Sequence, residues 1–377
     1  MIPYGRQKID QDDIDAVVAA LKSDFITTGP LVPEFEKAFA KKVGARHATA
    51  VSSGTAALHV ACLAAGFKPG IHFATSAMTF VASANCGLYC GWRPTLVDIT
   101  GNGLMDPGDL ERRIRKDTRA FIPVHYGGMT CDMESIQRIA GDDLAIEIIE
   151  DACHALGAMY NGYPVGSCHY SNMSCFSFHP VKHVTTGEGG MITTNSDELD
   201  VLLKVYRSHG IFKDEKYIGP HDPWYYEIHG LGFNYRMTDF QAALGISQLK
   251  KLDSFVKRRR AIASMYDDAF NSNQNFSTIA PPARCVPAYH LYPILLSKGH
   301  FSRKREIFDK LKAVGIGVQV HYIPIHYQPY YTRLGFKDGN YPRAEQFYQA
   351  ELSIPIHPSM SDVDVETVIE KVREIIR

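Results

Sequence analysis

The sequence predicts an α/β fold, in which a mostly parallel sheet in a large domain is followed by a smaller C-terminal α/β domain. Strand-like runs alternate with helical patterns of about ten residues through the first two thirds of the chain, the order typical of a parallel sheet covered on both faces. The strand-like runs are mainly apolar, which indicates strands buried on both sides. After a long helical region the alternation resumes on a smaller scale. We therefore predict a large domain at residues 1–250 and a small domain at residues 251–377.

The elements of the large domain are predicted from their periodicity and end signals. Residues 10–22 carry apolar side chains at intervals of three and four, which predicts a helix. Residues 32–43 form the next helix, which Pro33 opens and Gly44 ends. Strands and helices then alternate, with strands at 47–51, 72–75, 94–98, 120–125 and 144–149 and helices at 55–65, 80–89, 106–115 and 133–140.

The later elements follow a different order. Two strands, at 173–178 and 191–194, lie close together and are joined by a glycine-rich turn. A long helix is predicted over residues 239–270, and the polar segment 271–287, with three prolines, is a candidate linker. The small domain then consists of strands at 290–296 and 317–321 and helices at 303–314 and 363–376.

The composition excludes several classes of protein. Among the 377 residues, 40 Lys and Arg balance 41 Asp and Glu, so the chain lacks the basic excess of a broad nucleic-acid surface. A hydrophobic content of 45% excludes an acidic disordered chain. The first residues do not resemble a secretory signal, and the eight cysteines form no C-x-x-C pair. We therefore expect a cytoplasmic protein with reduced thiols.

Two long uncharged stretches interrupt this balanced charge. Residues 69–92 and 152–181 contain no Asp, Glu, Lys or Arg. Both contain Pro, Gly, Asn and His, so neither has the roughly 20 mostly apolar residues that a membrane-spanning helix needs. We expect protein interior or an enclosed site, and no membrane contact. The charges at the ends of the second stretch are Asp151 and Lys182.

Asp151 and Lys182 are candidates for chemistry because of where they lie. Asp151 lies just beyond the strand predicted at 144–149, and ligands of α/β sheets bind beyond the carboxyl ends of strands. A turn-capping aspartate is the alternative. A lysine at the end of an uncharged, enclosed run has a lowered pKa and attacks carbonyl groups. A solvated surface lysine is the alternative at position 182.

A third candidate is an anion site at residues 52–58, which read Ser-Ser-Gly-Thr-Ala-Ala-Leu between a strand and a helix. Small residues let the backbone approach an anion, and the free N–H groups of a helix start favour phosphate. An ordinary Ser/Thr cap is the alternative. The chain has no P-loop, no G-x-G-x-x-G and no H-E-x-x-H, so we predict neither a dinucleotide fingerprint nor a metal site.

Pyridoxal phosphate needs these three features together. Its aldehyde reacts with a lysine amine, its phosphate binds a helix N-terminus, and its ring nitrogen pairs with an aspartate. The sequence therefore predicts this cofactor.

The same motifs resemble those of the DegT/DnrJ/StrS family of sugar aminotransferases. The likeness extends from Tyr4 to Pro358, and the segments that carry it are 23–30, 53–58, 123–128, 150–157, 176–190, 208–210 and 232–237. The resemblance implies fold type I of the pyridoxal-phosphate-dependent transferases, the aspartate aminotransferase fold.

The resemblance also implies residue roles. Lys182 would bind the aldehyde, Asp151 would pair with the ring nitrogen, and Phe80 would stack on the ring. His154 stands near the phenolic oxygen, where most of the family has Gln. The phosphate would be held by Gly54, Thr55, Ser177 and, from a partner subunit, Asn234, so a homodimer with shared active sites is implied.

A dehydratase branch of the family has histidine in place of the lysine, so the presence of Lys182 favours transamination. Segments 176–182, 290–295, 319–326 and 344–351 are most similar to the branch that serves pseudaminic acid synthesis. That branch moves an amino group from L-glutamate to C4 of a UDP-linked 4-keto-6-deoxy-N-acetyl hexose. Candidate substrate contacts, each with a surface or packing role as its alternative, are Tyr4, Arg207, His209, Lys213, Lys216, Arg236, His321 and Tyr322.

Three other functions are compatible with the sequence. An aminotransferase of the same family could act on another UDP- or dTDP-ketosugar. An oxidoreductase on a doubly wound sheet is disfavoured by the missing glycine-rich fingerprint. A non-catalytic cofactor-binding protein is disfavoured by the intact pair of Lys182 and Asp151.

Overall fold

The computed structural model describes residues 1–141 and 146–377. Its main sheet has seven strands in the order β1-β9-β8-β5-β4-β2-β3. Five neighbouring strands are parallel, and only β9 runs antiparallel to its neighbours β1 and β8. The strands are β1 (His47–Val51), β2 (His72–Ser76), β3 (Arg93–Val97), β4 (Thr118–Ile122), β5 (Glu147–Asp151), β8 (Met173–Ser177) and β9 (Gly190–Thr194).

This sheet confirms the predicted fold class. Residues 144 and 145 of the strand predicted at 144–149 lie outside the described residues, and β5 continues two residues further than predicted.

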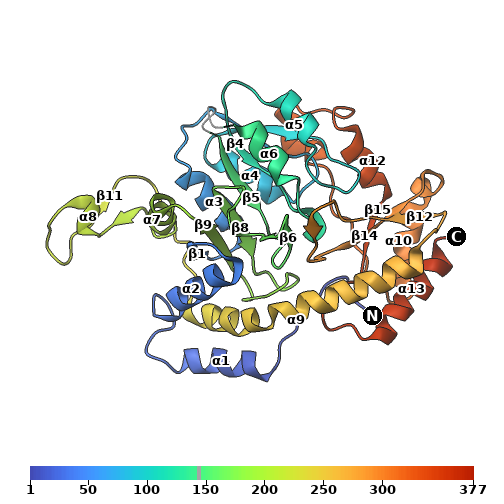
Figure 1. Cartoon of the computed structure of the whole chain (residues 1–377), viewed down its shortest axis with the longest axis horizontal. Helices are drawn as coiled ribbons and strands as arrows, with labels where there is room; N and C mark the ends of the chain where they lie inside the picture. Colours follow the sequence, from blue (N-terminus) through green and yellow to red (C-terminus); the bar gives the residue numbers. More distant parts are fainter. Residues whose placement is uncertain (142–145) are drawn as a thin grey trace.

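Helices cover both faces of the sheet (Figure 1). Ile148 and Ile149, neighbours on β5, belong to different apolar cores, as the alternation of a strand requires. The core that contains Ile149 includes most of α3, whose small apolar side chains allow close packing on the sheet. The helices of this region are α2 (Leu31–Val43), α3 (Gly54–Ala64), α4 (Val81–Tyr89), α5 (Pro107–Arg113), α6 (Met133–Ala140) and α7 (Asp197–Tyr206).

A second, three-stranded sheet has its own core near the C-terminus. Its order is β12-β14-β15, and both pairs are antiparallel. The elements around it are β12 (Phe276–Thr278), β14 (Tyr292–Leu296), β15 (Glu351–Ile354), α10 (Lys304–Ala313), α11 (Pro329–Arg333), α12 (Pro342–Ala350) and α13 (Asp362–Ile375).

The long helix α9 (Asp239–Phe270) connects the two sheets. It packs against α1 (Gln11–Leu21) and α2, and further along against α13 (Figure 1). The boundary predicted between residues 250 and 251 falls inside α9, so the two-domain division stays a prediction.

Two predictions in the small domain are wrong. Residues 317–321 form no strand, because Gly317 donates to the N-terminal Ile2, only Gln319 pairs with Ser353, and the N–H of His321 donates to a side chain. The proposed linker at 271–287 contains β12, whose residues pair with β14. Its prolines follow this strand, so they do not interrupt the pairing.

An arm projects from the body between α7 and α9 (Figure 1). It contains β10 (Ile211–Phe212), α8 (Glu215–Ile218) and β11 (Glu227–Ile228), and it exposes 77% of Trp224 and 85% of Leu231. The remaining short strands are β6 (Met159–Tyr160), β7 (Tyr163–Pro164) and β13 (Cys285–Val286). Within residues 1–141 and 146–377, no helix combines the length and the apolar character needed to cross a membrane.

Candidate active site

The carboxyl ends of β1, β5 and β8 meet at one edge of the main sheet. β8 is parallel to β5, and β1 has the same direction as β8 because both are antiparallel to β9. A cavity of about 420 Å³ lies at this edge. Its lining includes ten of the residues singled out from the sequence: Tyr4, Gly54, Thr55, Phe80, Asp151, His154, Ser177, Lys182, His321 and Tyr322.

Asp151, the last residue of β5, is buried at the base of the cavity. The hydroxyl of Ser83 donates to Asp151 Oδ2 at 2.6 Å, and the backbone N–H of Cys153 donates to Oδ1 at 3.2 Å. Thr79 in turn lies 2.7 Å from the Ser83 hydroxyl. These bonds hold a carboxylate in a fixed orientation where an apolar wall would otherwise disfavour charge.

Lys182 lies in the segment between β8 and β9 and lines the same cavity. Burial lowers the pKa of the Lys182 ammonium, although the nearby Cys153 and Asp151 act in the opposite direction. Within the described part of the chain, no carboxylate lies close enough to Lys182 Nζ to form an ion pair. The amine is therefore more available for reaction than that of a solvated lysine.

The start of α3 forms a cradle of backbone donors. Ser53 caps the helix by accepting a hydrogen bond from the N–H of Ala56 at 3.1 Å, which leaves the N–H groups of Gly54 and Thr55 as free helix-terminal donors. A Cβ on residue 54 would lie 2.7 Å from Ser177 Cβ and 3.3 Å from Cys153 Sγ. Only glycine allows this approach, and the resulting site fits a phosphate group.

His154 has one ring nitrogen fixed by the backbone. The N–H of Gly127 donates to His154 Nδ1 at 3.4 Å, so the proton of a neutral imidazole lies on Nε2. Burial, reinforced by Lys182, His321 and His183, holds the pKa of His154 well below its ordinary value. Nε2–H then donates to the Tyr322 hydroxyl at 3.1 Å. His154 can offer this donor to an anionic oxygen in the cavity when that oxygen takes the place of the Tyr322 hydroxyl.

These groups fit pyridoxal phosphate. The cavity offers a buried carboxylate for a protonated ring nitrogen, an amine for an aldehyde, and helix-terminal N–H groups for a phosphate. It also offers the Nε2–H of His154 for a phenolate oxygen.

Six of the predicted residues lie outside this cavity. Arg207 donates to the Glu36 carboxylate and, at 2.7 Å, to the carbonyl oxygen of Ala50, so its guanidinium serves the packing of α2 and β1. The others lie on or beside the projecting arm. Arg236 is half-buried, and the exposed ones are Lys213, Lys216, His209 and Asn234.

Two groups of the site were missed by the sequence reasoning: Ser83, which binds Asp151 without lining the cavity, and His290, which lines it. Ser83 stands one helical turn after Phe80, and this spacing on the predicted helix 80–89 is the signal that could have placed both on one face. The ring of His290 lies 4.3 Å from that of His154, between centroids, and also lines the cavity. No sequence pattern links His290 to His154.

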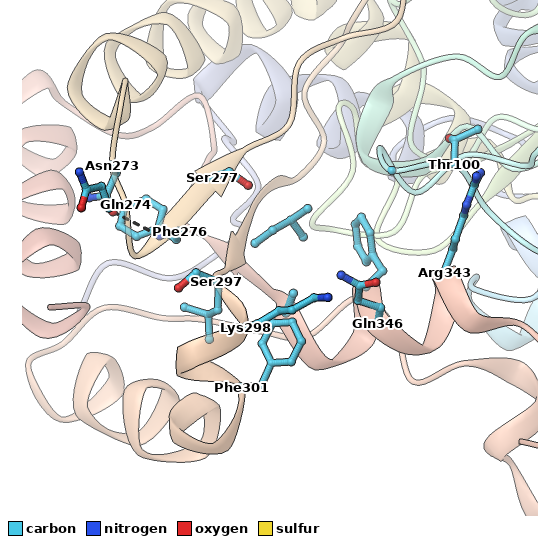
Figure 2. A pocket seen from close by; sticks show the side chains of 15 residues that line it. Thr100, Asn273, Gln274, Phe276, Ser277, Ser297, Lys298, Phe301, Arg343 and Gln346 are labelled. Carbon is cyan, nitrogen blue, oxygen red and sulfur yellow. Dashed lines mark hydrogen bonds between the residues drawn. The ribbon is translucent and has the colours of Figure 1, made fainter. Parts of the chain in front are cut away.

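A larger cavity of about 630 Å³ lies elsewhere, between the loop at Thr100 and the second sheet (Figure 2). Its labelled side chains include Lys298, Arg343 and Gln346, but neither Asp151 nor Lys182. The smaller cavity therefore contains the reactive groups. Within the described ranges, no group of three or more His, Cys, Asp or Glu could hold a metal ion.

Comparison with known proteins agrees with the chemistry that the cavity residues indicate. Residues 7–373 match the DegT/DnrJ/EryC1/StrS aminotransferase family. A UDP-4-amino-4,6-dideoxy-N-acetyl-beta-L-altrosamine transaminase from Campylobacter jejuni is 41% identical over 384 residues, covering 99% of this chain and 99% of the relative.

Solved structures are similar over the whole chain. PseC from Helicobacter pylori, an aminotransferase involved in the biosynthesis of pseudoaminic acid, has a TM-score of 0.93 at 34% identity, covering 100% of this chain and 99% of its own. The pyridoxal-phosphate form of Spr1654 from Streptococcus pneumoniae has a TM-score of 0.91 at 30% identity, covering 99% of this chain and 98% of its own. The chain therefore belongs to the DegT/DnrJ/EryC1/StrS aminotransferase family, and it is a pyridoxal-phosphate-dependent sugar aminotransferase of fold type I.

Proposed function

We propose that this enzyme moves the amino group of L-glutamate to C4 of a UDP-linked 4-keto-6-deoxy-N-acetyl hexose, the transamination of pseudaminic acid synthesis. The observation that supports the chemistry is the meeting of Lys182, Asp151 and the start of α3 in one cavity. The observation that supports the sugar is the 41% identity to a relative named for a transaminase of this kind.

Each cavity residue has a proposed part. When bound, pyridoxal phosphate supplies an aldehyde that takes amino groups and a ring that accepts electrons. Gly54, Thr55 and Ser177 would hold its phosphate, Phe80 would stack on its ring, and His154 would donate to its phenolic oxygen. Asp151 would keep a proton on its ring nitrogen.

Lys182 would act as the general base and then as the general acid. Its Nζ, whose pKa burial lowers, would take the proton from Cα of glutamate and later deliver a proton at C4 of the sugar. The buried Asp151, His154 and His290 line the same cavity as Lys182.

A panel of nucleotide sugars tests the proposal. The enzyme is incubated with glutamate and a series of UDP- and dTDP-linked keto sugars, and the products are identified by NMR. We expect the UDP-linked 4-keto-6-deoxy-N-acetyl hexose to be aminated at C4 with the highest kcat/KM. Preference for a dTDP-linked sugar would support the alternative, an aminotransferase of the same family with another substrate.

The matched control for this panel is Lys182→Ala. This variant should lose the visible-range absorption of the bound cofactor and turnover with every sugar, because no other amine in the cavity can replace Nζ. Turnover that survives in this variant would contradict the role of Lys182.

We also propose a homodimer with shared active sites. The exposed Trp224 and Leu231 give the arm an apolar surface, and Asn234, Arg236, Lys213 and Lys216 lie on or beside it. In such a dimer, Asn234 would reach the phosphate of the partner subunit, and the basic residues would lie near a sugar diphosphate. Sedimentation of a single species with the mass of one chain would contradict this arrangement.

A cytoplasmic location is part of the proposal. All eight cysteines are free thiols, the state that the reducing cytoplasm maintains. Detection of the protein outside the cytoplasmic fraction of its cells would contradict it.

A further inference from the structure

A buried chain of hydrogen bonds leads from the second sheet to the active-site cavity. Glu351 and Ser353, both on β15, are completely buried. The hydroxyl of Ser353 donates to Glu351 Oε1 at 2.5 Å, and Ser353 Oγ lies 2.8 Å from Nδ1 of His321. The backbone N–H of His321 donates to the other carboxylate oxygen, Oε2, at 2.8 Å. His321 lines the cavity, so it forms the active-site end of this chain.

The direction of these hydrogen bonds determines which ring nitrogen of His321 carries the proton. A serine hydroxyl has one hydrogen, and an ionised carboxylate can only accept. Because the hydrogen of Ser353 points to Glu351, Ser353 Oγ must accept from His321 Nδ1. Nδ1 therefore carries the proton of the neutral imidazole, and Nε2 has a free lone pair.

The surroundings favour this protonation state. Burial, together with the nearby Lys182, lowers the pKa of His321 to about 3, so its imidazole is neutral. Burial raises the pKa of Glu351 to about 7, while its bonds with Ser353 and His321 and the charge of Lys304 favour the ionised form. Among the described residues, none hydrogen-bonds to His321 Nε2. The free lone pair is thus available to a ligand in the cavity.

We propose that Glu351 and Ser353 hold His321 as a hydrogen-bond acceptor, whose Nε2 binds a hydroxyl group of the keto-sugar substrate. His321 is then a residue that selects the acceptor substrate, and Glu351 and Ser353 are positioning residues. This inference rests on the sugar aminotransferase function and adds the chemical group that His321 recognises.

The two substrates of the enzyme differ in what they offer to such an acceptor. A sugar presents hydroxyl donors beside its carbonyl group, whereas glutamate presents two carboxylates that can only accept. A lone pair on Nε2 therefore favours the sugar and gives no bond to the carboxylates of the amino donor. The acceptor state of His321 should matter in the sugar half of the reaction and not in the glutamate half.

Glu351→Gln reverses the hydrogen-bond chain with almost no change in shape. The N–H of His321 requires the amide oxygen on its side, so the amide NH₂ must face Ser353. Ser353 Oγ then accepts from the amide and donates to His321 Nδ1, which places the imidazole proton on Nε2. A donor now faces the hydroxyl groups of the sugar.

The first measurement is ¹⁵N NMR of the holoenzyme labelled at histidine, without any sugar, at about pH 8, above the pKa of about 7 at Glu351. The signals of His321 are assigned by their loss in His321→Gln. We expect a protonated Nδ1 in the wild type and a protonated Nε2 in Glu351→Gln. A His321 tautomer that is unchanged in Glu351→Gln would overturn the proposal.

The second measurement separates the half-reactions by single-turnover absorbance. With the keto sugar that the wild type uses best, Glu351→Gln should lose up to roughly 10-fold in the second-order rate constant, the net contribution of one hydrogen bond, because the sugar hydroxyl must turn its hydrogen away from His321 to accept from Nε2–H. The glutamate half-reaction should keep its wild-type rate. Equal losses in both halves would overturn the sugar contact, because they would indicate an effect on Lys182 or on the cofactor.

Two further variants complete the design. Ser353→Ala, which breaks the chain at its middle, should also weaken only the sugar half-reaction. Glu345→Gln is the matched control, because Glu345 also bonds to a histidine, accepting from His326 at 3.1 Å, but lies outside the cavity. Glu345→Gln should change neither half-reaction. These tests use whichever keto sugar is accepted, so failure of the UDP sugar proposed above leaves them decisive.

Discussion

At the scale of single residues, the active site depends on how Asp151 is held. Ser83 donates a 2.6 Å hydrogen bond to Asp151 Oδ2, and it comes from α4 rather than from the strand that carries the aspartate. Because this bond both orients the carboxylate and stabilises its charge, Ser83 is a positioning residue for the proton on the cofactor ring.

Ser83→Ala should therefore slow catalysis without abolishing cofactor binding. We expect kcat to fall roughly 10-fold, about 1.4 kcal/mol, because a hydrogen bond to a charged group contributes about this much. KM for glutamate should change little. Both half-reactions should slow together, since both need the ring proton, and single-turnover absorbance measures each of them.

The matched control for Ser83 is Ser135→Ala. Ser135 also donates to an aspartate, Asp132, at 2.7 Å, but on the exposed start of α6. This variant should keep wild-type kinetics. A loss of thermal stability in Ser83→Ala with unchanged kcat would show that Ser83 acts only in packing.

The sequence reasoning names residues that line the cavity where the signal is local. Gly54 and Thr55 adjoin in one motif at a helix start, and Lys182 ends an uncharged run. It fails where the partner is distant, since Ser83 and Asp151 are separated by 68 positions and His321 and Ser353 by 32. Such pairs arise from the tertiary fold, and a single sequence contains no signal for them.

At the scale of elements, the start of α3 must lie close to the end of β8. A Cβ on residue 54 would come within 2.7 Å of Ser177 Cβ. Real Cβ atoms do not come this close to another heavy atom. Gly54→Ala should push the helix start away from Ser177 by a few tenths of an ångström and misplace the N–H donors of the phosphate site.

We expect Gly54→Ala to weaken cofactor binding by roughly 10-fold, the effect of a lost or lengthened hydrogen bond to a charged group. Fluorescence titration of the enzyme depleted of cofactor measures the Kd. The better helix propensity of alanine, worth about 1 kcal/mol, offsets part of the steric cost in overall stability.

Gly108→Ala serves as the control for this prediction. Gly108 also lies in the first turn of a helix, α5, but its Cβ would meet only the flexible Asp106 and Arg112 side chains, at 3.3 and 3.6 Å. Its cofactor affinity should equal that of the wild type. Equal affinities in the two variants would contradict the importance of close approach at Gly54.

Elements with clear periodicity were predicted well, and elements defined by tertiary pairing were not. The helices α2, α3 and α9 follow from their apolar spacing and end signals. The segment 317–321 alternates like a strand, but its hydrogen bonds go to Ile2, to Ser353 and to the side chain of Glu351. These partners come from two separate regions, the N-terminal segment and β15, and one of them is a side chain, so the local pattern predicts a strand that the fold does not form.

At the scale of the whole molecule, the structure buries several histidines in the neutral state. Burial holds the pKa of His154, His183 and His290 well below the ordinary value of 6.5. It lowers the pKa of His321 to about 3 and that of His357 to about 4. These groups bind protons in the unfolded chain at pH values where the folded protein leaves them neutral.

Stability should therefore fall with pH below about 6.5. The buried histidines contribute fully to the free energy of unfolding above their unfolded pKa of 6.5. This contribution is lost as the pH falls towards their folded pKa values, because the unfolded state then binds more protons than the folded state. Each such histidine adds a slope of up to about 1.4 kcal/mol per pH unit. Glu351, whose pKa is raised from 4.5 to about 7 on folding, binds protons more tightly when folded and offsets part of this loss. His125, whose folded pKa is raised from 6.5 to about 10, has this effect only above pH 6.5.

His183→Gln isolates one of these contributions. His183 Nε2 lies 3.1 Å from the carbonyl oxygen of Ala288, and an amide N–H can replace that donor without taking up a proton. Urea unfolding between about pH 5 and 6.5 gives the free energy of unfolding as a function of pH. In His183→Gln its slope should be shallower than in the wild type, by an amount that corresponds to at most one fewer proton taken up on unfolding. Above about pH 7.5 the two slopes should be equal, since the unfolded histidine is neutral there. Equal slopes in the acidic range would mean that His183 is already protonated in the folded protein, which would contradict the burial of this cluster as neutral imidazoles.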